Sequence, residues 1–130
     1  MKITGTFEVQ MSPLKTTLPE CQGVQLARMG LEKKYHGELQ ASSQGEMLSA
    51  VTDLPGSAGY VAIERVKGSL SGYSGDFVLQ HYGTMRQGVS GLTLEVVPDS
   101  GTGQLKGLRG QMNIRIEEGQ HYYDFDFQLG

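Results

Sequence analysis

The amino-acid sequence predicts an all-β protein, an eight-stranded antiparallel barrel with little helix. At least five segments alternate polar and apolar residues with period two, which is the pattern of half-buried strands. Glycine is enriched, with 19 of 130 residues, and many glycines fall between the alternating segments. No segment carries the apolar stripe of an amphipathic helix. Eight strands joined by short links favour closure, because a closed sheet has no exposed edge.

The first strand is expected over residues 3–11, where apolar side chains occupy every second position. The segment Ser12–Gly23 follows and contains Pro13 and Pro19. A strand interior rarely accepts two prolines, because proline has no backbone N–H to donate to the sheet. We therefore expect the longest loop of the chain to run from Ser12 to Gly23.

Two long strands are expected next, Leu26–Tyr35 and Leu39–Val51, with Gly37 between them. The second is expected to be interrupted at residues 42–45, which are Ser-Ser-Gln-Gly. By composition Glu46–Leu54 is compatible with a short helix. Strand is favoured there, because no helix cap coincides with a helical stripe.

The rest of the chain alternates strands rich in β-branched and aromatic residues with glycine-rich turns. The expected strands are Tyr60–Val66, Phe77–Tyr82, Leu92–Val97, Gln111–Glu117 and Tyr122–Leu129. The expected turns are Asp53–Ser57, Gly68–Gly75, Gly88–Gly91, Pro98–Gly103 and Glu118–Gly119. The last strand is the most regular, with aromatic residues and aspartates on opposite faces.

Length and charge limit the class of protein. A chain of 130 residues predicts a single domain, 1–130. The net charge of -3 argues against a nucleic-acid partner.

No apolar run is long enough for a signal peptide or a membrane helix, so we expect no membrane partner and a cytoplasmic location. The one cysteine, Cys21, forms no internal disulfide and is expected to lie under a loop.

Four segments in order resemble a bacterial family of small proteins of unassigned function. They are Thr4–Val9, Val61–Gly68, Gly75–His81 and the glycine-rich run Gly101–Gly110. That family is associated with the allene oxide cyclase-like barrel. The resemblance implies an eight-stranded antiparallel barrel that often forms homo-oligomers, but it supplies no catalytic residue. A homodimer is expected, and the adjacent Tyr122 and Tyr123 on opposite faces of the last strand favour such an interface.

Two ionisable residues are the candidate cavity residues. His81 shares a strand face with Phe77 and Leu79, and Glu64 shares one with Ala62 and Val66. If these faces point inward, the two side chains form an acid–base pair suited to isomerisation or cyclisation. The alternatives are a core histidine and a structural ion pair of Glu64 with Arg109 or Arg115. A register shifted by one residue would instead expose His81.

Other chemistry is not favoured. His36 and His121 lie in turn-like, solvated contexts, so a zinc site shared with His81 is not expected. Gly101–Gly110 precedes a strand pattern and not a helix, which argues against a phosphate loop. Asp124 and Asp126 lie on the polar face of the last strand. We expect no cofactor and no metal, and the sequence identifies no catalytic residue.

Three functions remain open. The first is a binding module that holds a small apolar or amphipathic molecule in the barrel. The second is an isomerase or cyclase that uses His81 and Glu64 in the cavity. The third is a structural protein whose barrel is filled by its own side chains. The size of the inner side chains decides between a hollow and a filled barrel, and the sequence does not decide whether the protein is an enzyme.

Overall fold

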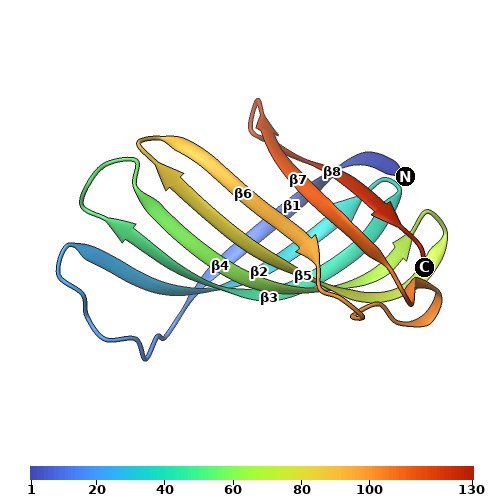
Figure 1. Ribbon diagram of the computed structural model, residues 1–130, viewed down its shortest axis with the longest axis horizontal. Coiled ribbons are helices and arrows are strands. Elements are labelled where there is room, and N and C mark those ends of the chain that lie inside the picture. The colour runs from blue at the N-terminus through green and yellow to red at the C-terminus, as the bar shows by residue number, and fades with distance from the viewer.

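The computed structural model describes all residues, Met1–Gly130, as a closed barrel of eight antiparallel strands in sequential order. The strands are β1 (Lys2–Leu14), β2 (Val24–His36), β3 (Leu39–Thr52), β4 (Ala58–Leu70), β5 (Tyr73–Arg86), β6 (Val89–Val96), β7 (Arg109–Glu117) and β8 (Gln120–Gln128) (Figure 1). A single helical turn, η1 (Gly103–Leu105), interrupts the link from β6 to β7. The predicted fold class is confirmed. No helix in the structure has the length and apolar character needed to cross a membrane.

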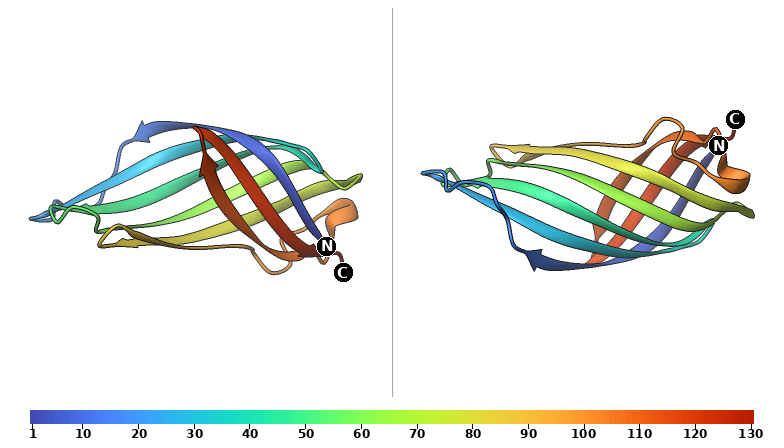
Figure 2. Two further views of the ribbon diagram at one scale, coloured as in Figure 1. Left: turned by 90° about the horizontal axis from the view of Figure 1, so that it is seen from above. Right: turned by 90° about the horizontal axis from the view of Figure 1, so that it is seen from below.

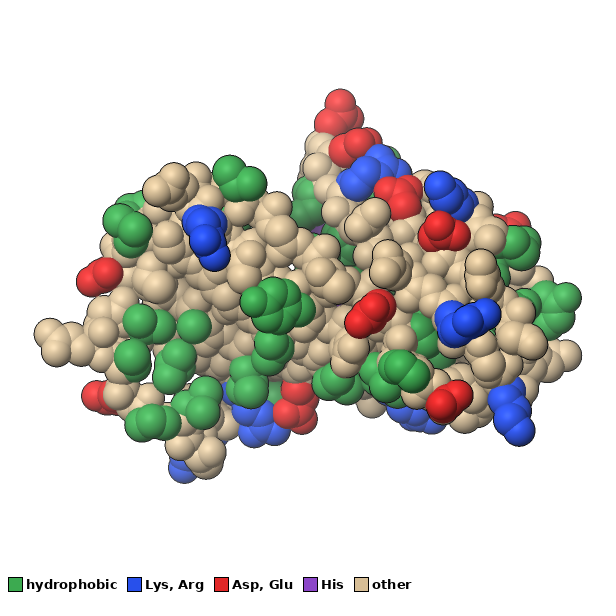
Figure 3. All heavy atoms as spheres, in the orientation of Figure 1, with side chains coloured by type: hydrophobic (Ala, Val, Ile, Leu, Met, Phe, Trp, Pro, Cys, Tyr) green, Lys and Arg blue, Asp and Glu red, His purple; other side chains and the backbone are tan.

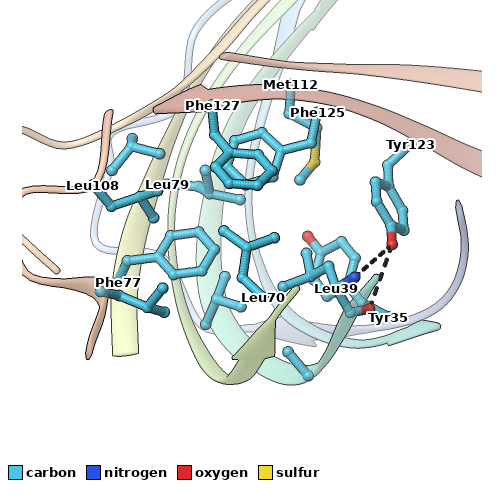
Figure 4. Close-up of a cluster of buried hydrophobic side chains, with 14 of the residues drawn as sticks. Tyr35, Leu39, Leu70, Phe77, Leu79, Leu108, Met112, Tyr123, Phe125 and Phe127 are labelled. Carbon is cyan, nitrogen blue, oxygen red and sulfur yellow. Dashed lines mark hydrogen bonds between the residues drawn. The ribbon is translucent and has the colours of Figure 1, made fainter. Parts of the chain in front are cut away.

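One end of the barrel is filled. Sixteen buried side chains form its core, among them the stacked pair Phe77 and Phe125, with Phe127 against Phe125 (Figure 4). The β6–β7 link crosses this end and buries Leu105 and Leu108 as a plug. The glycine-rich run of the sequence is therefore the segment that seals the filled end.

Tyr123 closes the same end from the side of β8. Its hydroxyl donates to the backbone oxygen of His36 at 2.9 Å and accepts from the N–H of Leu39 at 3.1 Å. A Cβ atom at Gly5 would lie 2.4 Å from this hydroxyl oxygen, so the paired position on β1 must be glycine. Tyr123 is wholly buried, which removes it from any surface of the last strand.

The opposite end of the barrel is open. β8 pairs with β1 only as far as Phe7, whereas β1 continues along β2 to Leu14. β6 and β7 share one residue pair, Glu95 and Gln111. The β7–β8 hairpin consequently covers only part of the barrel, and β1–β6 extend past it (Figure 2). The inner face of this extension is therefore not covered by β7 and β8.

Several predicted boundaries were wrong. β1 continues through Pro13, so the loop begins only at Lys15. The proline is accepted because β1 has no partner on the β8 side at this point. Strand β3 is unbroken across residues 42–45, where Ser43 and Gly45 face inward beside Glu64. The turn expected over Gly68–Gly75 is only Ser71–Gly72, both with positive φ, as a two-residue hairpin loop requires.

Candidate functional site

A cluster of buried polar side chains separates the filled end from the open end. At its centre the Glu64 carboxylate is completely buried and accepts four hydrogen bonds. Oε1 receives Nε2–H of His81 at 2.8 Å and Nζ–H of Lys33 at 3.0 Å. Oε2 receives the hydroxyl groups of Tyr35 at 2.5 Å and Ser43 at 2.6 Å. Every acceptor position of the carboxylate is thereby used, as a buried charge requires.

The sheet register explains why the cluster forms. Residues paired across neighbouring strands share a face, so Lys33 and Ser43 lie in one inner layer. Glu64 lies in the next layer opposite Gly45. A Cβ at Gly45 would lie 2.8 Å from the Cα of Glu64, so glycine permits this close approach of β3 and β4. His81 follows one layer further toward the open end, where it pairs with Ala62.

The hydrogen bonds keep Glu64 ionised. Burial alone would raise the pKa of this carboxyl group. The hydrogen bond from His81 and the positive charge of Lys33 outweigh burial, with further help from Ser43 and Tyr35. Together they lower the pKa of Glu64 from 4.5 to about 2. Burial and the nearby Glu64 charge raise the pKa of Tyr35 well above its ordinary value, so this phenol stays a hydrogen-bond donor at neutral pH.

Lys33 supplies the charge that balances Glu64. Its ammonium group is buried and lies over the ring of Phe7, 5.1 Å from the ring centre, and over that of Tyr35 at 5.8 Å. Such cation–π contacts favour a buried ammonium group. Lys33 was not among the predicted cavity residues, although the sequence carries a signal for it: this lysine alternates with Leu31 and Tyr35 on the apolar face of its strand.

His81 connects the buried carboxylate to the open end. With its hydrogen on Nε2, the tautomer that satisfies Glu64, the ring presents Nδ1 as an acceptor. The hydroxyl of Tyr60 lies 3.3 Å from this nitrogen and makes a long hydrogen bond. Tyr60 is half-buried, and burial together with Glu64 raises the pKa of its phenol. The order Glu64, His81, Tyr60 therefore runs from the core toward solvent.

Gly83 makes room for Tyr60. The two residues pair across β4 and β5, and a Cβ at Gly83 would lie 2.3 Å from Cε1 of the Tyr60 ring. The ring thus lies across the glycine and directs its hydroxyl to His81. Tyr60 was not among the predicted cavity residues either, although it shares the strand face of Ala62 and Glu64.

The structure places the two candidate cavity residues together. His81 and Glu64 both face the interior, and Tyr82, the strand neighbour of His81, is exposed. The shifted register is therefore excluded. Glu64 does not contact Arg109 or Arg115. Arg115 pairs instead with Asp124 on the outside, and Arg109 contacts Gln128. Whether His81 and Glu64 bind a ligand stays a prediction.

The other histidines lie apart from this cluster. His36 is half-exposed and pairs with Glu8 at 3.0 Å. His121 was expected in a solvated turn but lies partly buried, with its ring 5.2 Å from that of Phe7. No group of three or more histidine, cysteine or acidic side chains is arranged to hold a metal ion.

The inner face of the open end is mainly apolar. Four methionines lie on it: Met11, Met29, Met47 and Met85. Met29 and Met47 are half-buried and share a layer with Ala62 and His81, while Met11 and Met85 are exposed by 56% and 42%. Leu92 completes the face from β6, where it pairs with Gly83. A notch in the surface separates β6 from the β7–β8 hairpin (Figure 3).

Comparison with known proteins identifies relatives without an assigned activity. A family model described as a protein of unknown function (DUF3224) matches residues 3–127. A crystal structure of a protein of unknown function from the same family, from Shewanella oneidensis MR-1, superposes with a TM-score of 0.97. The two chains are 54% identical, and the match covers 100% of this chain and 98% of the other. No curated protein matches the chain.

Proposed function

Because this chain belongs to the DUF3224 family of unknown function, we propose a function from the site alone: it binds a small apolar or amphipathic molecule at the open end. The ligand lies on the inner face of β1–β6, beside Tyr60 and above the buried cluster around Glu64. The filled end offers no such place, since its core residues and the leucine plug occupy the interior. The third possibility, a barrel filled by its own side chains, thus describes one end of the molecule only.

The concentration of methionine on this face supports the proposal most directly. Four of the six methionines in the sequence gather there, and they come from four different strands. Methionine is flexible and polarizable, and proteins use it on surfaces that adapt to apolar ligands of different shapes. Exposed apolar side chains on the inside of a barrel also carry a cost in water, which a ligand removes by covering them.

Polar groups at the base of this face favour a ligand with one polar end. The Tyr60 hydroxyl is half-buried and holds only one, long hydrogen bond to His81. An oxygen atom of a ligand beside Tyr60 gives this hydroxyl group a second hydrogen-bond partner in place of water. The balanced charges of Lys33 and Glu64 below it favour a neutral polar group over a free charge.

Titration with the amphipathic dye anilinonaphthalene sulfonate tests the binding proposal. We expect dye fluorescence to rise on binding, and Met47→Glu and Met85→Glu to weaken binding at least tenfold, because each variant introduces a charge on the inner face. The matched control is Val89→Glu, on the outside of β6 at the same end, where the side chain is 72% exposed. Absence of binding by the parent protein, or equal weakening by the control, contradicts the proposal.

A second candidate function rests on the chain of hydrogen bonds from Glu64 through His81 to Tyr60. In this arrangement Tyr60 takes a proton from a carbon beside a carbonyl group as its own proton moves to Nδ1 of His81. Both proton transfers then run in reverse, and Tyr60 returns a proton to a different carbon of the substrate. The sum is an isomerisation that moves a hydrogen and a double bond within the substrate, and it needs no cofactor.

Hydrogen exchange separates the two candidates. A long-chain methyl ketone in heavy water serves as the probe, and its α-hydrogens are followed by proton NMR. If the acid–base candidate is correct, the protein accelerates exchange, Tyr60→Phe abolishes the acceleration, and the variant still binds the ketone. If binding is the only function, the parent protein and Tyr60→Phe leave exchange at the rate in buffer.

A further inference from the structure

The edge of β6 that faces β7 is unpaired over most of its length. β6 and β7 share only the pair of Glu95 and Gln111, whereas β6 pairs with β5 from Val89 to Val96. Beyond that single pair, the β7–β8 hairpin diverges from β6 (Figure 2). The notch that separates β6 from the hairpin therefore has the edge of a β-strand as one of its walls.

The register shows which backbone groups of this edge lack a partner. The N–H of Val97 donates to the oxygen of Val78, which places the hydrogen-bonded pairs of β5 and β6 at the odd-numbered residues of β6. The even-numbered residues consequently direct their N–H and C=O groups toward β7. The bridge at Glu95 uses those of its two even-numbered neighbours. Ser90 and Leu92 keep a donor and an acceptor each that no other strand of the chain satisfies.

This edge carries neither charge nor proline, the residues with which proteins commonly block the addition of a foreign strand. Residues 89–94 are Val-Ser-Gly-Leu-Thr-Leu, and Val89 is 72% exposed. The other unpaired edge, on β1 beyond Phe7, contains the charged Glu8 and also Pro13, which has no N–H to offer. Of the two edges, that of β6 is therefore the one open to an extended chain.

We propose that the edge of β6 binds an extended segment of a partner protein by strand addition. The segment runs antiparallel to β6 and forms two backbone hydrogen bonds with Ser90 and two with Leu92. A single strand suits the notch, because the β7–β8 hairpin stands on its other side. A second copy of this chain would bring a whole sheet against the hairpin. The interface depends on the edge of β6 alone and not on a ligand at the open end.

The surroundings of the edge define the side chains of the partner segment. Its residues opposite Ser90 and Leu92 turn inward, next to Met85 and the apolar inner face, so they are apolar. The residue between them turns outward to solvent and is polar. The outward Glu95 carboxylate accepts a hydrogen bond from an amide and forms no ion pair within the chain. A lysine or arginine opposite Thr93 lies diagonal to Glu95 and reaches it.

Amide hydrogen exchange measured by NMR tests the free edge and its occupant. In the protein alone, the amides of Ser90 and Leu92 should exchange rapidly, whereas those of Gly91 and Thr93, which bond to β5, should exchange slowly. The probe is the capped peptide Thr-Lys-Val-Thr-Val-Thr at millimolar concentration. It should slow exchange at Ser90 and Leu92 by at least about threefold and leave Met11, on the edge of β1, unchanged.

Three results of this experiment overturn the proposal. The first is slow exchange at Ser90 and Leu92 in dilute protein without peptide, which would mean that the edge is not free. The second is no slowing at millimolar peptide. The third is protection that rises with protein concentration in the absence of peptide, which would assign the edge to a second copy of the chain.

Methylation of the peptide backbone tests how the segment binds. N-methylation of both valines removes the donors that face β6 and should abolish binding. N-methylation of the threonine between them, whose N–H points away from β6, should leave binding intact. Equal effects of the two modifications would show that the peptide is not added as a strand.

Ser90→Pro and Ser90→Ala form a matched pair of variants. Proline removes the free N–H without breaking a bond to β5, so this variant should fold but bind the peptide at least about tenfold more weakly. Alanine keeps the N–H and should bind like the parent. Circular dichroism verifies folding, and Leu92→Pro replaces Ser90→Pro if the latter does not fold. A folded proline variant that binds the peptide like the parent overturns the proposal.

Discussion

Nε2 of His81 lies 2.8 Å from Oε1 of Glu64 in a part of the barrel where both side chains are buried. This contact lies at the boundary between the filled end and the open end of the barrel. On one side of it aromatic and aliphatic side chains fill the barrel, and on the other the inner face carries methionines that water reaches. A buried polar cluster of this kind fixes the positions of its neighbours, because each donor has one acceptor available to it.

Replacement of Glu64 by glutamine should destabilise the protein by about 3–5 kcal/mol, because the variant leaves the buried ammonium group of Lys33 without a counter-charge. Glutamine also replaces one acceptor oxygen of the carboxylate by an NH2 group, which is a donor and faces the donors that now bind Glu64. Urea unfolding at neutral pH measures the loss. Glu8→Gln serves as the control, since Glu8 forms an exposed pair with His36, and its effect should stay within about 0.5 kcal/mol. Equal stability of the two variants would show that the cluster does not stabilise the fold.

Acid should remove the contribution of Glu64. Its pKa is lowered from 4.5 to about 2 on folding, so the charged form stabilises the folded state. That contribution is complete above pH 4.5 and is lost as the pH falls toward about 2. It amounts to about 3 kcal/mol at neutral pH.

The variant Glu64→Gln isolates this effect. Arg115 also lowers the pKa of Asp124, so the parent protein loses stability in acid for more than one reason. The difference in unfolding free energy between the parent and Glu64→Gln should shrink as the pH falls from 4.5 toward 2. A difference that stays constant over this range would mean that Glu64 has an ordinary pKa.

Gly83→Ala should displace Tyr60 and cost about 1–3 kcal/mol, because the added methyl group overlaps the tyrosine ring. The variant should also weaken dye binding at the open end. In a Tyr60→Ser background the same substitution should be nearly neutral, since the ring that it strikes is absent. A double-mutant cycle by thermal unfolding measures the coupling, and purely additive effects would contradict the packing of Tyr60 over Gly83.

The alternation of polar and apolar residues with period two was sufficient to predict the barrel, the number of strands and the inward direction of Glu64 and His81. The places of the hairpin turns were also predicted, but the residues at which the strands begin and end were not. Glycines and serines near the turns, such as Gly68 and Gly75, lie inside long strands, because pairing with neighbours outweighs their weak preference for strands. Pro13 likewise lies in a strand because the sheet has an unpaired edge there, and edges depend on the fold as a whole.

The partners of Glu64 could be predicted only in part. Lys33 and Ser43 each interrupt an apolar strand face, which marks them as inward polar residues. Their meeting at one carboxylate depends on how the strands are staggered, and a linear pattern does not give the stagger. For the same reason the sequence could not show that one end is filled and the other open. That division follows from the plug at Leu105 and Leu108 and from the short β7–β8 hairpin.

Methyl NMR of methionine-labelled protein tests the binding proposal most directly. The six methionines report on three regions: Met11, Met29, Met47 and Met85 on the inner face of the open end, Met112 in the filled core, and Met1 at the exposed amino terminus. An amphipathic ligand, added below the concentration at which it forms micelles, should shift the methyl signals of the first four and leave Met112 and Met1 unchanged. No shift in the first four signals, or shifts confined to Met1 or Met112, would contradict a binding site at the open end of the barrel.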